Sequence, residues 1–407
     1  MASQYAEGIS SGNRIEALDV IRGFALFGIL VMNMPYFSQS FFAEMGGEIV
    51  WDSQIDRFIT VVRDTLFSGK FNAMFCMLFA VGFTIQWQRW RQNNTIIFAT
   101  TMYLRRLFWL FTIGIFHYVL LWPGDILHIY AVLGVSLLLF QRINDKGLIV
   151  LIVLGLFFPV WLLVYRYFIP NPEWRAQFIE LVQQLGNGEN SAYGAGSLFD
   201  SIRQNLTSLK ATYSSNLFIL PNVRNSVELL TTMLLGLLLG RREFFDSLCR
   251  NPQLIRRLQW LTLLVSVLFT SIDAAYISDM EMGTNGGVRR LIKFQCYEIT
   301  RLATMSFYVL TLMRCLASPR LKKSLQLLIP LGRIPLTNYL LQSVIAVTLC
   351  YYWGFGLWGK ISPLMSLLIA GAILFVIQLP LSHLWLNKFP LGPMEWLWRR
   401  LSYGKNR

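Results

Sequence analysis

The chain has 407 residues, of which 55% are hydrophobic and 14% are charged, and its formal net charge is +14. Because about a quarter of the residues of a soluble domain are charged, this composition excludes a soluble globular protein and indicates a polytopic membrane protein. The 36 Lys and Arg residues stand in short clusters between apolar runs, not on one tail or surface. They therefore indicate membrane topology, and nucleic acid is not expected as a partner.

Ten apolar runs approach the length of about 20 residues that crosses a bilayer. They lie near 15–37, 71–88, 102–121, 125–141, 147–168, 226–240, 258–277, 294–315, 334–352 and 361–385. The sequence predicts an all-α transmembrane bundle that forms one domain over 1–407. An even number of spans places both termini on one side, which the positive-inside rule makes cytoplasmic. We expect a multi-pass protein of a bacterial cytoplasmic (inner) membrane, surrounded by lipids, and a homo-oligomer is compatible with this architecture.

The first two spans carry ionisable groups near their ends. Asp19 and Arg22 lie three residues apart and share one helix face near the cytoplasmic end. They form an anchoring ion pair, or Arg22 binds a phosphate or carboxylate that enters from the cytoplasm. Lys70 stands at the outer entrance of the second span, where a lysine either reaches the headgroups or binds an anion. A helix that begins nearer Asp56 would instead place Arg63 and Lys70 in a polar cavity.

The stretch HYVLLWPGDILHIY (117–130) holds two of the three histidines around a Pro-Gly pair. This pair predicts a tight turn between the third and fourth spans, at the outer edge of the membrane. His117 lies near the outer end of the third span, Asp125 lies at the turn, and His128 lies one turn into the fourth span. Asp125 can act as a helix cap. Together the three residues suit a general base with its orienting carboxylate, a zinc site or a proton relay.

Two segments lie outside the expected spans. The segment 170–217 is predicted to be extracytoplasmic, with an interfacial helix over NPEWRAQFIELVQQL followed by a mobile loop over GNGENSAYGAGS, whose small polar residues cannot form a core. The loop is either a substrate lid or an inert connection. The segment 386–407 contains EWLWRR and is predicted to be an amphipathic cytoplasmic tail.

The eighth and ninth spans contain further polar residues. Glu298 and Arg301 are three residues apart, so they either compensate each other or bind a substrate in the outer half of the membrane. Asn338 and Gln342 are four residues apart in the ninth span and share a face, and Ser343 is expected to face inward as well. Hydrogen bonds between helices explain these residues, and substrate binding is the alternative.

Five motifs along the chain resemble one family of membrane proteins. The first is LDVxRGFALxGILxxN, at the start of the first span, and the others are GKFNAMFCMLFAVGF (69–83), HYVLLWPGDIL (117–127), GRIPLTNYLLQS (332–343) and GPMEWLWR (392–399). In this order and over nearly the whole chain, they resemble the YeiB-type family, which carries a domain of unknown function. That family is similar, more distantly, to transmembrane acyltransferases of the heparan-glucosaminide acetyltransferase type.

The resemblance implies transfer of an acyl group from a cytoplasmic donor, for which acyl-CoA is the candidate, to a small-molecule, glycan or lipid acceptor at the outer face. In this reading His117 is the base and Asp125 orients it. Lys70 or Arg301 contacts an anion or oxyanion, and Arg22 contacts the donor phosphate. The alternative is a small-molecule transporter or exporter whose histidines carry protons, and a third reading is a structural or lipid-binding protein. No metal and no permanently bound cofactor are predicted.

Overall fold

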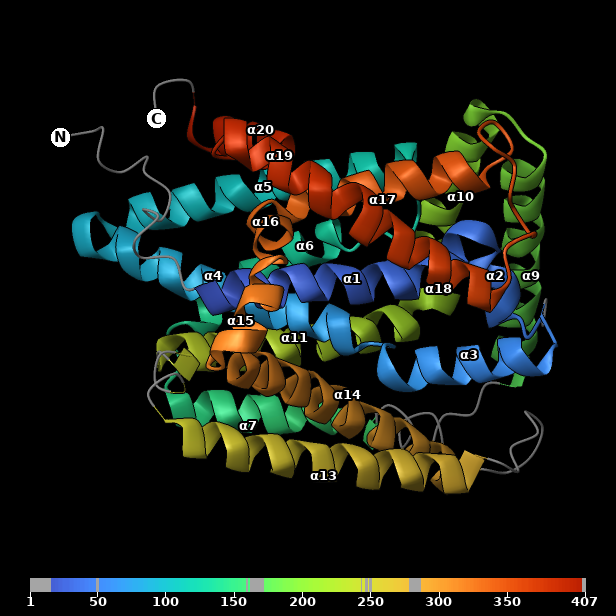
Figure 1. Ribbon diagram of the computed structural model, residues 1–407. Helices are drawn as coiled ribbons and strands as arrows, with labels where there is room; N and C mark the ends of the chain where they lie inside the picture. Colours follow the sequence, from blue (N-terminus) through green and yellow to red (C-terminus); the bar gives the residue numbers. More distant parts are fainter. Residues whose placement is uncertain are drawn as a thin grey trace.

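The computed structural model describes residues 16–48, 51–158, 160–161, 172–242, 244–245, 248, 251–277 and 287–404. All regular secondary structure within these residues is helical, which confirms the predicted all-α fold. Most of the long helices lie side by side along one common direction (Figure 1). The long helices are α1 (Glu16–Ser38), α3 (Gln54–Leu66), α4 (Lys70–Asn93), α5 (Ile96–Leu120), α6 (Leu127–Phe140), α7 (Asp145–Leu156), α9 (Pro172–Gly194), α10 (Leu198–Ser214), α11 (Ile219–Arg241), α13 (Pro252–Ile277), α14 (Gly287–Leu316) and α17 (Pro335–Cys350).

Shorter elements complete the described chain. They are α2 (Phe41–Met45), the 3₁₀ turn η2 (Asn216–Phe218), α15 (Pro319–Gln326), α16 (Ile329–Arg333), α18 (Pro363–Ala372), the π-helical turn η3 (Ile373–Gln378), α19 (Leu379–Lys388) and α20 (Pro393–Tyr403). The turn η3 joins α18 and α19 into one continuous apolar helix.

Seven helical segments of the described chain are long and apolar enough to cross a membrane, as expected for a polytopic membrane protein. They are Glu16–Ser38, Gln54–Gln92, Ile96–Leu120, Asn216–Arg241, Pro252–Ala275, Ile292–Leu316 and Pro363–Lys388. The apolar helices α6 and α17 are shorter, and part of the predicted span 147–168 lies outside the described residues. The count of ten spans and the side on which the termini lie stay predictions.

Helix α1 lies in the middle of the bundle, with α4, α14, α16, α17 and α18 packed around it (Figure 1). It is buried on nearly all sides, because its sequence is apolar around the whole circumference. At two positions, α1 approaches its neighbours so closely that only glycine fits. A Cβ atom on Gly28 would lie 2.1 Å from the ring of Phe71, and one on Gly23 would lie 2.4 Å from the carbonyl oxygen of Leu328.

Different helices lie at the two ends of the bundle. Helices α15, α16 and α20 lie at the end where α1 begins, whereas α2, α9 and α10 lie at the opposite end (Figure 1). We call these the inner and outer ends of the bundle. At the inner end, α20 packs on α5 through Trp398, whose indole nitrogen donates to the Arg106 carbonyl at 2.8 Å. The described part of the predicted tail 386–407 is therefore docked on the bundle.

The structure corrects the loop predicted within 170–217. Helix α9 continues through the glycine-rich stretch to Gly194, and α10 follows after a short connection. Tyr193 is buried there and stacks on Tyr351 with ring centroids 4.3 Å apart. The prediction failed because it assumed that the segment would have to form a core from its own residues. Its apolar partners come instead from the α17–α18 connection. Small residues allow this close packing instead of preventing it.

Candidate functional site

The turn between α5 and α6 brings His117 and Asp125 into direct contact, which the sequence alone left open. His117 Nδ1 lies 2.7 Å from Asp125 Oδ2, and both side chains are buried. The approach depends on Gly114, because a Cβ atom at that position would lie 2.8 Å from Asp125 Oδ1 and 2.5 Å from the backbone nitrogen of His128. A side chain larger than hydrogen would push the turn away from α5.

Asp125 also binds His128 through its other oxygen. His128 Nδ1 and the His128 backbone nitrogen lie 2.7 Å and 3.0 Å from Asp125 Oδ1. The carboxylate therefore caps the start of α6, as the sequence suggested, and bonds two imidazoles at the same time. On the far side of His128, its Nε2 lies 2.5 Å from the hydroxyl of Tyr213 on α10.

The second nitrogen of His117 contacts a hydroxyl from a distant part of the chain. His117 Nε2 lies 2.8 Å from Ser343 Oγ on α17. The five side chains Ser343, His117, Asp125, His128 and Tyr213 form one continuous row of hydrogen bonds, which we call the histidine network. If both imidazoles are neutral, each Nδ1–H donates to Asp125 and each Nε2 accepts a hydroxyl proton, so every group in the row is satisfied.

The charge of the network is set by Asp125, which lies in the turn outside the membrane-spanning helices. Burial acts to raise the pKa of this carboxyl, but its hydrogen bonds and charge interactions with His117 and His128 outweigh burial and hold the pKa below its ordinary value. Asp125 is therefore an anion at neutral pH. An anion beside Nδ1 fixes the orientation of the His117 ring and stabilises it when it takes up a proton.

A cavity of about 710 Å³ opens near the inner end of the bundle. We call it the inner cavity, and it is lined by residues of α1, α4, α5, α6, α11, α17 and α20. Four arginines line it, Arg22, Arg89, Arg106 and Arg399, with Asp19 bonded to Arg22 at 3.0 Å. The predicted ion pair of Asp19 and Arg22 is therefore present, and the same two residues face the cavity.

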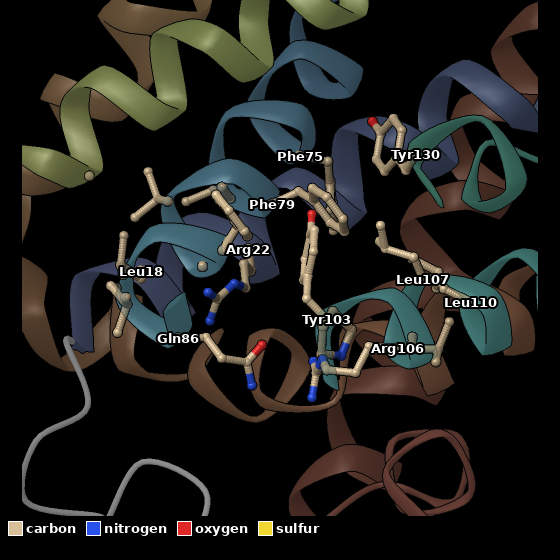
Figure 2. A pocket seen from close by; sticks show the side chains of 18 of the residues that line it. Leu18, Arg22, Phe75, Phe79, Gln86, Tyr103, Arg106, Leu107, Leu110 and Tyr130 are labelled. Carbon is tan, nitrogen blue, oxygen red and sulfur yellow. The ribbon is translucent and has the colours of Figure 1, made fainter. Parts of the chain in front are cut away.

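The inner cavity is polar at one side and apolar at the other. Figure 2 shows the polar groups of Arg22, Gln86 and Arg106 gathered at one side, whereas Phe75 and Phe79 lie at the other. Along α4, the distance from Arg89 to Phe75 is about 21 Å at 1.5 Å per residue. A hydrocarbon core is about 30 Å thick, so the cavity lining along α4 extends over a distance of more than half that thickness.

One tyrosine separates the inner cavity from the histidine network. Tyr339 lines the cavity, and its ring lies against the ring of His117 with centroids 5.2 Å apart. Its hydroxyl accepts the backbone N–H of Ile126 at 3.4 Å, at the long end of the hydrogen-bond range. His117 therefore lies directly behind one side chain of the cavity lining.

Comparison with known proteins places the chain in a family. It is 31% identical to the protein YxaH of Bacillus subtilis (strain 168) over 97% of this chain and 95% of the relative. The chain belongs to the YeiB-type family. It is 25% identical to YeiB of Escherichia coli (strain K12) over 95% of both chains, and residues 239–405 match the family model described as a protein of unknown function (DUF418). Both relatives are described as uncharacterized, and no solved structure matches significantly.

The DUF418 match covers only part of the site of this YeiB-type protein. Ser343 and Tyr339 lie within 239–405, whereas His117 and Asp125 precede it. The YeiB-type site is therefore assembled from both halves of the chain. Among the described residues, no cluster of three or more His, Cys, Asp or Glu side chains has the arrangement of a metal site.

The YeiB-type bundle also holds a smaller polar pocket of about 210 Å³. We call it the outer pocket, and its lining includes Asn33, Asn72, Glu228 and Arg301. Arg301 donates to Glu298 Oε2 at 2.8 Å, so the structure shows the self-compensating pair that was one of the two predictions. The other guanidinium contacts, to Thr232 Oγ1 and the Glu228 carbonyl, hold Arg301 in place.

The predicted binding residues that lie outside the linings of both cavities include Lys70, Glu298, Asn338 and Gln342. Lys70 is buried and donates to the Asp64 carbonyl at 3.1 Å, so it does not extend to the headgroups. Asn338 bonds Ser382 Oγ at 3.0 Å, and Gln342 bonds Gln378 at 3.0 Å. These bonds connect α17 to the helix formed by α18, η3 and α19. Asn338 and Gln342 therefore form hydrogen bonds between helices, which was the first of the two interpretations drawn from the sequence.

Three functional candidates were not predicted from the sequence. Ser343 was interpreted together with Asn338 and Gln342 as a source of hydrogen bonds between helices, and Tyr213 and Tyr339 were not selected. The sequence relates two of these residues to each other, because Tyr339 and Ser343 are four residues apart and so lie on the same face of α17. Nothing in the sequence relates Tyr213 to His128, since they lie 85 positions apart.

Proposed function

We propose that the chain is a membrane acyltransferase that takes an acyl group from a cytoplasmic donor of the acyl-CoA type and passes it to a hydroxyl or amine acceptor at the outer face. One observation carries this proposal. His117 is held by Asp125 in the orientation of a general base, directly behind Tyr339, which lines the inner cavity.

The inner cavity suits an anionic, amphipathic donor. Its arginines supply positive charge for phosphate groups at the polar side, and guanidinium groups bind phosphate through paired hydrogen bonds. Its aromatic side, which includes Phe75 and Phe79, suits an extended chain that ends in a thioester. A donor bound in this direction carries its acyl group toward Tyr339 and His117.

In the proposed reaction His117 Nε2 takes the proton of the attacking group. Asp125 stabilises the imidazolium that forms, because its carboxylate lies 2.7 Å from Nδ1. The thiolate of the donor then recovers the proton from His117 as it leaves. General acid–base catalysis of this kind contributes about 10²–10⁴-fold to a rate.

A proton-coupled transporter is the second candidate, and the position of the two cavities favours it. On α1 the lining of the inner cavity extends to Ile29, and the lining of the outer pocket begins at Met32. On α4 the inner cavity extends to Phe75, and the outer pocket begins at Asn72. The cavities therefore follow each other along the same pair of helices, with about one helical turn between them. An alternating-access path for a small molecule has this arrangement.

The acyl-transfer proposal is tested with the purified full chain and radiolabelled acetyl-CoA and longer acyl-CoA donors. We expect saturable donor binding and CoA release that His117→Ala abolishes. No binding and no release with any chain length would contradict the proposal. Proton-driven uptake into proteoliposomes that depends on His117, with no CoA release, would favour the transporter instead.

A further inference from the structure

Ser343 has an unusual environment for a serine within a helix. Hydroxyl side chains on helices of this protein commonly donate to the carbonyl four residues earlier, as Thr84, Thr112, Thr231 and Thr348 do. The Ser343 hydroxyl instead has its hydrogen bond with His117 Nε2, at 2.8 Å. It therefore points away from its own backbone and toward a base.

The three side chains Ser343, His117 and Asp125 have the connectivity of a nucleophile, a base and an orienting group. The hydroxyl bonds one imidazole nitrogen and the carboxylate bonds the other, at 2.8 Å and 2.7 Å. This arrangement activates a serine hydroxyl, because the imidazole accepts the proton as the oxygen attacks. The three residues come from α5, the α5–α6 turn and α17, so no local sequence motif predicts this arrangement.

The nucleophile lies just beyond the inner cavity. Ser343 is one helical turn from Tyr339 on the same face of α17. Tyr339 both lines the cavity and packs on His117. The Tyr339 hydroxyl is held by the long 3.4 Å bond from the Ile126 N–H, so we expect this side chain to rotate and open a path from the cavity to the Ser343 hydroxyl.

We propose that Ser343 carries the acyl group covalently between donor and acceptor, an inference that rests on the proposed acyl transfer for its donor. Ser343 Oγ attacks the carbonyl carbon of an acyl thioester while His117 takes the hydroxyl proton. The carbon–sulfur bond breaks, the thiol leaves with that proton, and an acyl ester forms on Ser343. The acceptor hydroxyl or amine then attacks the ester and gives its proton to His117, which returns it to Ser343.

This two-step route explains how donor and acceptor can use opposite faces. The thiol leaves through the inner cavity before the acceptor arrives, so the two substrates need not be bound together. The competing explanation is that Ser343 is only a hydrogen-bond partner that holds the His117 ring. In that case Ser343 is a positioning residue, and no adduct forms on it.

The nucleophile is tested first without an acyl donor. The full chain in detergent is treated with a fluorophosphonate, which reacts with activated serines, and the adduct is located by peptide mass spectrometry. We expect one adduct, on Ser343, that S343A removes and His117→Ala reduces at least 100-fold. Ser366→Ala is the matched control, because Ser366 is also a buried helix serine but its hydroxyl has no hydrogen-bond partner.

Tyr339→Ala tests whether the tyrosine blocks access. We expect it to label faster than the native chain, and a thermal melt establishes that each variant is folded. Absence of a Ser343 adduct in both the native chain and folded Tyr339→Ala would overturn the assignment.

The acyl step is tested next with a labelled acyl-CoA in the absence of acceptor. We expect the label on Ser343 as an ester, and on S343C as a thioester that neutral hydroxylamine cleaves. If S343A releases CoA at the native rate, the carrier role fails and acyl transfer stands. If Ser343 reacts with the fluorophosphonate through His117 but no acyl-CoA is consumed, the proposed donor fails and the nucleophile stands.

Discussion

The His117 Nδ1 and Asp125 Oδ2 atoms lie 2.7 Å apart across the α5–α6 turn, and both side chains are buried. Since the carboxylate also binds the His128 imidazole and the α6 backbone, a single anion organises the base and the helix start together. Changes at this anion are therefore expected to alter both activity and folding, and the two effects need separate measurements.

Replacing His117 with Ala is expected to lower acyl transfer about 10²–10⁴-fold, because the proton acceptor is lost. His383→Ala is the matched control, since His383 is exposed on α19 and should leave the rate unchanged. The rate of CoA release measures both. Equal losses in the two variants would show that the effect does not come from the network.

Asp125→Asn is expected to lower both the rate and the melting temperature. The two carboxylate oxygens each bind one imidazole, and in Asn one of them becomes an NH2 donor, so one ring loses its acceptor and the anion is lost as well. The CoA-release rate and a thermal melt are measured on the same sample. A native rate in Asp125→Asn would contradict the proposed role of the carboxylate.

Gly114→Ala is expected to destabilise the fold by about 1–3 kcal/mol, because the new methyl group would overlap the Asp125 turn. Gly371→Ala provides the contrast, since a Cβ atom there meets nothing within 4 Å. Because Gly371 lies in a helix, its replacement is expected to stabilise by up to about 1 kcal/mol. Denaturation of the purified chain in detergent compares the two, and an equal shift in both would contradict the packing argument.

Arg106→Gln is expected to weaken donor binding about tenfold, since a charge-assisted hydrogen bond contributes about 1.5 kcal/mol. The difference in donor affinity between the native chain and Arg106→Gln should become smaller at high salt, because added ions screen the attraction between Arg106 and the donor phosphate in the native chain. Arg320→Gln is the control, as Arg320 is exposed on α15 outside the inner cavity. Equilibrium binding of radiolabelled acyl-CoA measures the effect, and identical affinities of the two variants would place the donor elsewhere.

Glu189 on α9 is expected to make the fold less stable as the pH rises. Burial raises the pKa of this carboxyl from 4.5 to about 7, against the hydrogen bond that Ser40 donates at 2.6 Å. The folded chain therefore holds a proton between about pH 4.5 and 7 that the unfolded chain releases. The stabilisation is complete below the unfolded pKa and is lost as the pH rises through 7.

Glu189→Gln should remove this part of the pH dependence, because an amide does not titrate in that range. Melting temperatures between pH 5 and pH 8 measure it, with Glu180→Gln on the exposed side of the same helix as the control. The expectation fails if the native chain and Glu189→Gln lose stability in parallel over this range.

The amino-acid sequence by itself determined the features that depend on neighbouring residues. Hydropathy over some 20 residues predicted the membrane helices, because one helix has to cover its own backbone polar groups in lipid. Spacing of three residues placed Arg22 beside Asp19, and the Pro-Gly turn placed Asp125 near His117. Each of these contacts is set by one helix or one short turn.

Only the tertiary structure decided which distant residues complete the site. Ser343 lies 226 positions from His117, and the cavity that ends at Tyr339 is formed by seven helices. It also showed that α9 continues where a loop was expected, since the core around Tyr193 comes from another part of the chain. Helix packing brings these groups together, and a single sequence does not state which faces of its apolar helices meet.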